Sequence, residues 1–253
     1  MDGTRNEGQG GVAKRAALID QIRAEGNEVL LLDCGDIFQG TPYFNLFDGE
    51  IEMKAMTNMA YDAATIGNHD FDAGIDGLVK QMKHADFSFI NSNYIVKDTP
   101  LNGKTLPYKI WNYGDIKIGI YGLGIELKGL VPEALYTNTT YQDPVKTALK
   151  IEKQLVDELG CHYVICLSHL GYEYRGDKIS DVKLAAATHS TDLILGGHTH
   201  TFLQEPRIVK NQNKKPVIIN QAGWAGILLG RIDLFFEKGS LRKAQNGGTL
   251  TVK

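Results

Sequence analysis

The fold is decided by four short apolar runs, each ending in polar residues: VLLLDCGD (29–36), DAATIGNHD (62–70), YVICLSH (163–169) and LILGGHTH (193–200). Short apolar runs bounded by Gly, Asn and Asp are typical of buried strands. Segments with helical periodicity lie between these runs. Because strands that alternate with helices pair in parallel, the sequence predicts an α/β fold.

The rest of the chain fits a layered α/β class in which β-sheets are flanked by helices. Helical periodicity predicts helices over residues 11–25, 50–59, 75–84, 144–159 and 178–188. Further strands are predicted over 87–90, 108–112, 116–122, 217–220 and 227–236. Asp143 is expected to cap the helix that begins at Pro144. The sequence shows no linker, repeat or second compositional block, so we predict one domain over residues 1–253.

Composition limits the partners of this chain. The 27 basic and 30 acidic residues leave a net charge of −3, which predicts no polymeric nucleic acid partner held by bulk charge. No run reaches the roughly 20 apolar residues that span a bilayer, and the N-terminal residues contain no apolar signal-peptide region. Cys34, Cys161 and Cys166 lie in apolar runs, so we expect buried thiols rather than disulfides.

Metal-ligand residue types follow all four opening runs. They are Asp36, Asn68, His169, and the pair His198 and His200. Because ligands gather at the carboxyl ends of parallel strands, we expect these side chains to converge. On extended backbone His198 and His200 point to the same side, about 6.5 to 7 Å apart, so each can face one of two metals. A carboxylate such as Asp36 is the natural shared ligand of two metals about 3.5 to 4 Å apart.

These residues belong to longer motifs: GDIFQGTP (35–42), GNHDFD (67–72), SHLGYE (168–173), GGHTH (196–200) and NQAGWAGILLG (220–230). Together they resemble the signature segments of the calcineurin-like metallophosphoesterases, most closely the catalytic domain of the 5′-nucleotidases. The resemblance runs in order from about Gly11 to the C-terminus. It implies a layered fold with the metal site at the carboxyl ends of strands, and a hydrolase that acts on phosphoester bonds.

The resemblance also implies a role for each residue of the metal site. Asp36 would bridge two divalent metals, drawn from Mn, Zn, Fe or Co. Asn68, His169 and His198 would complete the second metal, and His200 would belong to the first.

Two further residues, His69 and Asp72, match the catalytic pair of the family. His69 follows the expected ligand Asn68, which places it to meet a phosphoryl oxygen or the leaving group, and Asp72 could orient it. Beyond this pair, Tyr172 and Glu173 are candidates to face the substrate. Trp224 either lines the rim of the site or packs in the interior.

The chain departs from the family pattern at both ends. Family members begin with a strand that ends in Asp-x-His, and no such motif precedes Gly11 here. We therefore expect an incomplete first metal site, because the chain either begins in the loop after that motif or is a natural variant. The family's C-terminal substrate domain is also absent from residues 1–253. A separate protein that carries such a domain is a candidate partner.

The favoured hypothesis is a metal-dependent phosphoesterase in which a metal-bound hydroxide attacks a nucleoside monophosphate or a related small phosphoester. The alternative is a non-catalytic or partner-dependent metal-binding domain, or a truncated and impaired nucleotidase. A related activity on a sulfur ester is a more distant alternative. The resemblance favours the periplasm or the cell surface as the compartment.

Overall fold

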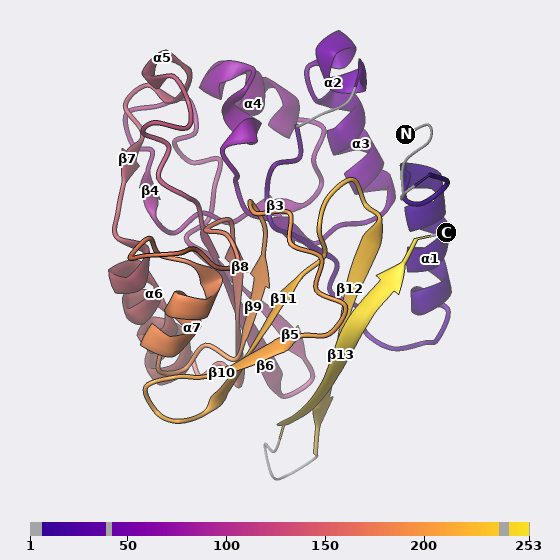
Figure 1. Cartoon of the computed structure of the whole chain (residues 1–253), viewed down its shortest axis with the longest axis vertical. Coiled ribbons are helices and arrows are strands. Elements are labelled where there is room, and N and C mark those ends of the chain that lie inside the picture. Colours follow the sequence, from indigo (N-terminus) through magenta and orange to yellow (C-terminus); the bar gives the residue numbers. More distant parts are fainter. Residues whose placement is uncertain (1–6, 39–41, 238–242, 253) are drawn as a thin grey trace.

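The computed structural model describes residues 7–38, 42–237 and 243–252, and it has a mixed α/β architecture with helices on the flanks of its sheets (Figure 1). Its main sheet has six strands in the order β10-β11-β9-β8-β6-β5. In chain order these strands are β5 (Tyr108–Tyr113), β6 (Ile116–Leu123), β8 (Tyr163–Ser168), β9 (Leu193–Gly196), β10 (Arg207–Lys210) and β11 (Pro216–Gln221). Strands β6, β8, β9 and β11 pair in parallel, as predicted, and the two edge strands are antiparallel.

A second, smaller sheet holds the other two opening runs. It consists of the parallel strands β1 (Leu32–Asp33), β2 (Ala63–Ala64) and β3 (Ser88–Phe89). The antiparallel hairpin of β12 (Leu228–Phe236) and β13 (Lys243–Thr251) lies beside helix α1 (Figure 1). A short antiparallel pair joins β4 (Tyr94–Ile95) to β7 (Thr140–Tyr141).

Helices cover the sheets from opposite sides, with α6 (Pro144–Lys153) and α7 (Asp181–Ala187) on one flank and α1 (Val12–Arg23) and α3 (Glu50–Asn58) on the other (Figure 1). The other helices are α2 (Pro42–Phe47), α4 (Gly74–Met82), α5 (Glu133–Tyr136), the 3₁₀ turn η1 (His69–Phe71) and the π-helical turn η2 (Gln154–Glu158). None of the helices in the described ranges is long and apolar enough to cross a membrane.

The main sheet is buried on both faces, which explains its continuous apolar runs. Along β8, Val164 and Cys166 pack in the cluster under α6 and α7. The alternating residues Tyr163, Ile165 and Leu167 pack in the cluster that faces the smaller sheet and the β12 hairpin. The fold positions the ends of β8 and β9 against the end of β1 through this second cluster.

Most predicted elements are present, with three corrections to their extents. The strands predicted within the runs 29–36 and 62–70 shorten to the two-residue strands β1 and β2. The helix predicted over 178–188 begins only at Asp181, because Ser180 adopts extended backbone and accepts a hydrogen bond from the Lys183 N–H. The helix predicted over 144–159 ends as an α-helix at Lys153 and continues as the π-helical turn η2.

Other predictions concern single residues. The Asp143 carboxylate caps α6 by accepting a hydrogen bond from the Lys146 N–H at 2.9 Å, as predicted. Cys161 and Cys166 are buried as predicted, whereas Cys34 is only half-buried. Within the motif at 35–42, Gln39, Gly40 and Thr41 lie outside the described residues.

Candidate metal centre

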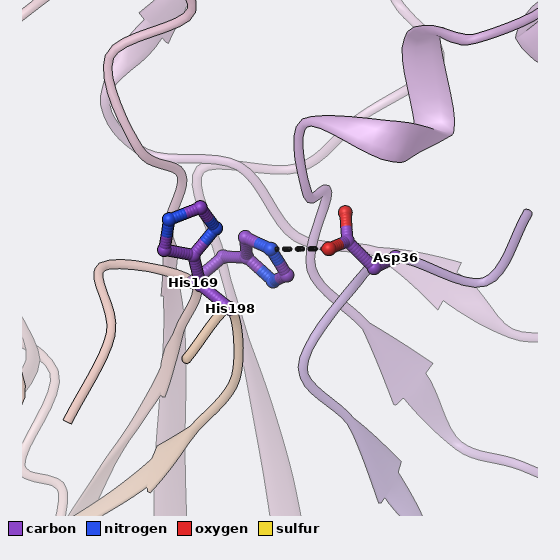
Figure 2. A group of neighbouring side chains, drawn as sticks. All are labelled: Asp36, His169 and His198. Carbon is purple, nitrogen blue, oxygen red and sulfur yellow. Dashed lines mark ion pairs between the residues drawn. The ribbon is translucent and has the colours of Figure 1, made fainter. Parts of the chain in front are cut away.

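Three of the predicted ligands meet where strands of the two sheets end (Figure 2). Asp36 follows β1, His169 follows β8, and His198 lies in the loop after β9. One ligand atom from each residue lies within 4.8 Å of the other two. These side chains are far apart in sequence, and the predicted convergence of strand ends brings them together.

Asp36 and His169 are in direct contact in the interior. Asp36 Oδ2 lies 2.9 Å from His169 Nε2, and the two side chains are 8% and 1% exposed. Burial alone would raise the pKa of Asp36, but the His169 charge and the His69 N–H outweigh it, so this pKa is lowered. Burial would likewise lower the pKa of His169, but the Asp36 charge outweighs it, so this pKa is raised. Without a metal the two residues therefore form an ion pair.

Hydrogen bonds at Nδ1 orient both imidazole rings. His169 Nδ1 donates to the Cys34 carbonyl at 2.5 Å, and His198 Nδ1 donates to Asn68 Oδ1 at 2.8 Å. In this tautomer each neutral ring keeps its lone pair on Nε2, which is the arrangement of histidines that bind metals. The ring centroids of His169 and His198 are 5.3 Å apart. Asn68 thereby joins the group through its contact with His198.

His198 is suited to act as a neutral ligand. Burial, together with the nearby charge of His169, lowers the pKa of His198 to about 4. A ligand histidine must be unprotonated to bind a metal. His198 can therefore bind a metal at neutral pH without first losing a proton.

Asp70 holds the loop that follows β1 against the loop that follows β2 through hydrogen bonds, and the sequence analysis did not identify it. Its carboxyl is fully buried and accepts hydrogen bonds from the N–H groups of Asp36, Ile37 and Gly67 at 2.7 to 3.0 Å. Burial and the Asp36 charge nevertheless raise the pKa of Asp70 to about 7. Asp70 directly follows the predicted residues Asn68 and His69 in the sequence, but its contacts with Asp36 and Ile37, more than 30 residues away, do not follow from that position.

Backbone conformation at the site is unusual. Asp36, His198 and His200 have φ values of 62°, 67° and 53°, in the left-handed region that favours glycine. The extended backbone predicted across residues 198–200 is therefore wrong. Side chains in this conformation cost about 1 to 3 kcal/mol each and persist where the surrounding structure holds them.

Glycines let the loops approach closely enough to form the group. A Cβ on Gly67 would lie 2.2 Å from Asp36 Oδ1 and 2.6 Å from His169 Cε1. A Cβ on Gly197 would lie 2.9 Å from both the Cys34 carbonyl oxygen and His169 Nδ1. Neither position has room for a side chain.

His69 and Asp72 form a pair at the edge of the group. His69 Nδ1 lies 2.9 Å from Asp72 Oδ2, and the side chains are 35% and 39% exposed. The His69 backbone N–H donates to Asp36 Oδ1 at 2.8 Å, which fixes the pair relative to the Asp36 carboxylate. Because Asp72 holds Nδ1, the Nε2 atom of His69 is the one that can face a substrate.

His200 lies apart from the three-residue group. It is exposed, and its ring stacks on Trp224 with centroids 6.3 Å apart and planes 21° apart. The Trp224 side chain is 45% exposed, so Trp224 lies at the rim rather than in the interior. Of the other substrate-facing candidates, Tyr172 and Glu173 both contact Arg207, at 3.1 Å and 2.9 Å.

A cavity of about 1590 Å³ reaches the group. It lies between β1, α1 and the β12 hairpin, and Asp36, His198, His200 and Trp224 line it together with apolar residues. The apolar lining includes Leu32, Ile118, Ile165, Leu195, Leu234 and Phe236. The polar group therefore lies at one side of a largely apolar cavity.

Comparison with known families identifies the chain. The family model described as calcineurin-like phosphoesterase matches residues 8–202. The chain belongs to the calcineurin-like phosphoesterase family. It is 35% identical over 263 residues to the snake venom 5′-nucleotidase of Gloydius brevicauda, in an alignment that covers 96% of this chain and 43% of that protein.

Solved structures of family relatives have the same fold. The 5′-nucleotidase precursor from Thermus thermophilus superposes with a TM-score of 0.84 at 33% identity, over 96% of this chain and 49% of that one. The NAD nucleotidase of Haemophilus influenzae superposes with a TM-score of 0.83 at 26% identity, over 95% of this chain and 45% of that one. The chain thus spans less than half the length of these relatives.

Membership of this family implies divalent metal ions, and the donor set fits them. His169 Nε2 is buried and has no hydrogen-bond partner in the described structure, although Asp36 Oδ2 lies 2.9 Å away. That contact has the length of an ion pair but not the geometry of a hydrogen bond. Two ligands that each lie about 2.0 to 2.2 Å from one metal are themselves about 3 Å apart, so the pair suits a shared cation.

Proposed function

We propose that this chain is a metal-dependent phosphoesterase that hydrolyses nucleoside monophosphates or related small phosphoesters, within one domain over residues 1–253. The observation that carries the proposal is the group of a buried His169 with the half-buried Asp36 and His198, and the more exposed pair His69 and Asp72 beside it. A nucleotide-type substrate is favoured because the chain is 35% identical to a 5′-nucleotidase.

Metal ligation in this proposal uses the five sequence-predicted residues. Asp36, Asn68, His169 and His198 would hold one divalent metal, and Asp36 and His200 would contribute to another. Bound metals supply Lewis-acid polarisation of the phosphoryl group and activation of water. The neutral state of His198 at pH 7 and the buried Nε2 of His169, which faces Asp36 without a hydrogen bond, support this ligand set.

His69 would act on the substrate itself. Asp72 holds His69 Nδ1 at 2.9 Å, and the backbone N–H of His69 is fixed on Asp36, so the ring is oriented from both sides. From there Nε2 can donate a proton or hydrogen bond to a phosphoryl oxygen or to the leaving oxygen. Asp72 would stabilise the protonated ring in that role.

The test is phosphate release from a nucleoside monophosphate by the 253-residue chain with Mn²⁺, Zn²⁺ or Co²⁺ added. We expect metal-dependent release that chelation removes and re-addition of the metal restores. His69→Ala serves as the matched control, because it should keep the metal and lose most of the activity. Release that is equal with and without chelator would refute the proposal.

A second candidate is a non-catalytic metal-binding domain, or one that depends on a partner carrying the substrate-binding part. The placement of His200 favours it, because this ring faces Trp224 and lies outside the three-residue group. Metal analysis of the purified chain separates the two candidates. Two tightly bound metals per chain with phosphate release support the enzyme, whereas one metal and no release support the second candidate.

A further inference from the structure

A buried carboxyl group contacts the strand ends that lead to His169 and His198, and it has no role in the function proposed above. Asp181, the first residue of α7, is fully buried. Across residues 7–38, 42–237 and 243–252 it forms no ion pair with a lysine or arginine. Burying an unpaired carboxylate is unfavourable, and acidic residues are almost never fully buried without a partner. The position of Asp181 therefore requires an explanation.

One carboxyl oxygen holds the strand end that carries His169. Asp181 Oδ1 accepts a hydrogen bond from Ser168 Oγ at 2.5 Å, and Ser168 immediately precedes His169. Ser168 Oγ in turn accepts from the Leu170 N–H at 3.2 Å, and the Asp181 N–H donates to the Gly171 carbonyl at 2.8 Å. The backbone on both sides of His169 is thus tied to Asp181.

The other oxygen faces the strand end that leads to His198. Asp181 Oδ2 has no hydrogen-bond partner in the described structure, and a Cβ on Gly196 would lie only 2.2 Å from it. The same Cβ would lie 3.0 Å from Gln221 Nε2, which donates to the Gly197 carbonyl at 2.7 Å. Asp181 therefore lies between the ends of β8 and β9, each of which leads into a ligand histidine.

The pKa of Asp181 also connects this residue to the metal centre. Burial raises the pKa of Asp181 to about 7, while the Ser168 hydrogen bond and the charge of His169 oppose this shift. The positive charge that favours an ionised Asp181 therefore lies on the side of the metal centre. A scaffold role alone would be met by an uncharged side chain of the same shape.

We propose that Asp181 is a positioning residue for the metal centre, acting on His169 through Ser168 and on the loop of His198 through its packing against Gly196. The inference rests on the metal site of the proposed function, but not on catalysis. Residues that orient metal ligands in this indirect way typically change metal affinity by about 10- to 100-fold when they are substituted.

The test is the affinity of the whole chain for Mn²⁺ alone, measured by titration calorimetry without substrate. Asp181→Asn keeps the shape and removes the charge, and we expect it to weaken Mn²⁺ binding about 10- to 100-fold. The matched control is Glu152→Gln. Glu152 is also buried and accepts hydrogen bonds from the N–H groups of residues 189–191, away from the metal centre. We expect it to lower the melting temperature and to leave Mn²⁺ affinity unchanged.

Ser168→Ala gives an independent measurement if Asp181→Asn does not fold, because it removes only the hydroxyl that links Asp181 to the backbone of His169. We expect weaker Mn²⁺ binding in Ser168→Ala and recovery in Ser168→Thr. Wild-type Mn²⁺ affinity in Asp181→Asn would overturn the inference. If only Ser168→Ala folds, wild-type Mn²⁺ affinity in that variant would overturn it. Equal weakening of Mn²⁺ binding in Glu152→Gln would also overturn it. Phosphate release by the wild type is measured in parallel. A wild type that binds Mn²⁺ but releases no phosphate refutes the proposed function alone, whereas one that binds no Mn²⁺ overturns both.

Discussion

Gly67→Ala is the substitution that most directly tests the proposed metal centre. Gly67 has an ordinary backbone conformation, so alanine is compatible with its φ and ψ, and the effect must come from the added methyl group. That methyl would lie 2.2 Å from Asp36 Oδ1, 2.5 Å from the Asp36 backbone nitrogen and 2.6 Å from His169 Cε1. All three distances are well below van der Waals contact, so both Asp36 and His169 must move.

The size of the effect follows from these distances. Restoring ordinary contact requires Asp36 to shift by about 1 Å, which breaks its 2.8 Å hydrogen bond from the His69 N–H. Overpacking of this kind costs about 1 to 3 kcal/mol of unfolding free energy. Disturbing the residues that orient metal ligands typically costs about 10- to 100-fold in metal affinity, and here the candidate ligands themselves move, so we expect metal affinity to fall by about 100-fold.

The assay compares Mn²⁺ affinity by calorimetry with unfolding by denaturant, for Gly67→Ala and for Gly248→Ala. Gly248 is the matched control, because its φ is also ordinary and a Cβ there meets only the Gln204 carbonyl oxygen at 3.9 Å. We expect Gly248→Ala to change neither quantity appreciably. If Gly67→Ala binds Mn²⁺ as tightly as the wild type, Asp36 and His169 are not joint ligands and the proposed site is wrong.

Four further predictions concern individual residues. His69→Ala should lower kcat by about 10²- to 10⁴-fold with unchanged metal content, because general acid–base groups contribute on that scale. Asp72→Asn should lower kcat less. Loss of metal in His69→Ala would instead show that His69 is a metal ligand. Calorimetry over a pH series should show Mn²⁺ affinity rising as pH rises through the raised pKa of His169, because the metal displaces its proton. In the metal-free chain, the stability that His169 contributes is complete below pH 6.5 and is lost as pH rises through that raised pKa. The stability that Asp36 contributes is present above pH 3.8 and is lost as pH falls through its lowered pKa. Thermal unfolding should therefore show the greatest stability between pH 3.8 and pH 6.5. Trp224→Ala should raise KM for a nucleoside monophosphate about 5- to 150-fold relative to glycerol phosphate, because base stacking contributes about 1 to 3 kcal/mol. Equal changes for both substrates would exclude stacking.

The sequence predicts the parts of this fold that depend on hydrophobic pattern. The runs around Ile165 and Ile194 are continuously apolar because both faces of the main sheet are buried, and such runs identify parallel strands without knowledge of their partners. The convergence of Asp36, His169 and His198 follows from that arrangement, because all three come after strands whose ends meet.

Strands that depend on a partner are harder to predict. The sequence KAQNGGTLT of β13 is polar and contains two glycines, yet it pairs with β12 along its whole length. Strand propensity reflects packing against neighbours more than an intrinsic backbone preference, so nothing within this segment indicates a strand. The two-residue strand β1 shows the opposite error, because its apolar run continues beyond the residues that pair.

Roles that depend on contacts distant in sequence also escape prediction. Asp181 acts through Ser168, 13 residues away, and Asp70 binds the backbone of Asp36, 34 residues away. Neither contact follows from spacing. The position of His200 was mispredicted because of its local backbone. Alternate side chains share a face only on extended backbone, and both His198 and His200 have left-handed backbone.

Backbone strain supports the assignment of a functional site here more strongly than residue type alone does. Eight non-glycine residues of the described ranges have positive φ, and three of them are the predicted ligands Asp36, His198 and His200. Glycine would adopt each of these conformations without the steric cost, so a chain selected only for stability would favour it. Each position instead carries a side chain with a metal-binding atom. Such a conformation persists because the surrounding structure compensates for it, and here the Asp36–His169 ion pair and the His198–Asn68 hydrogen bond are that compensation. The same contacts that hold the strained loops therefore present the ligand atoms toward one another.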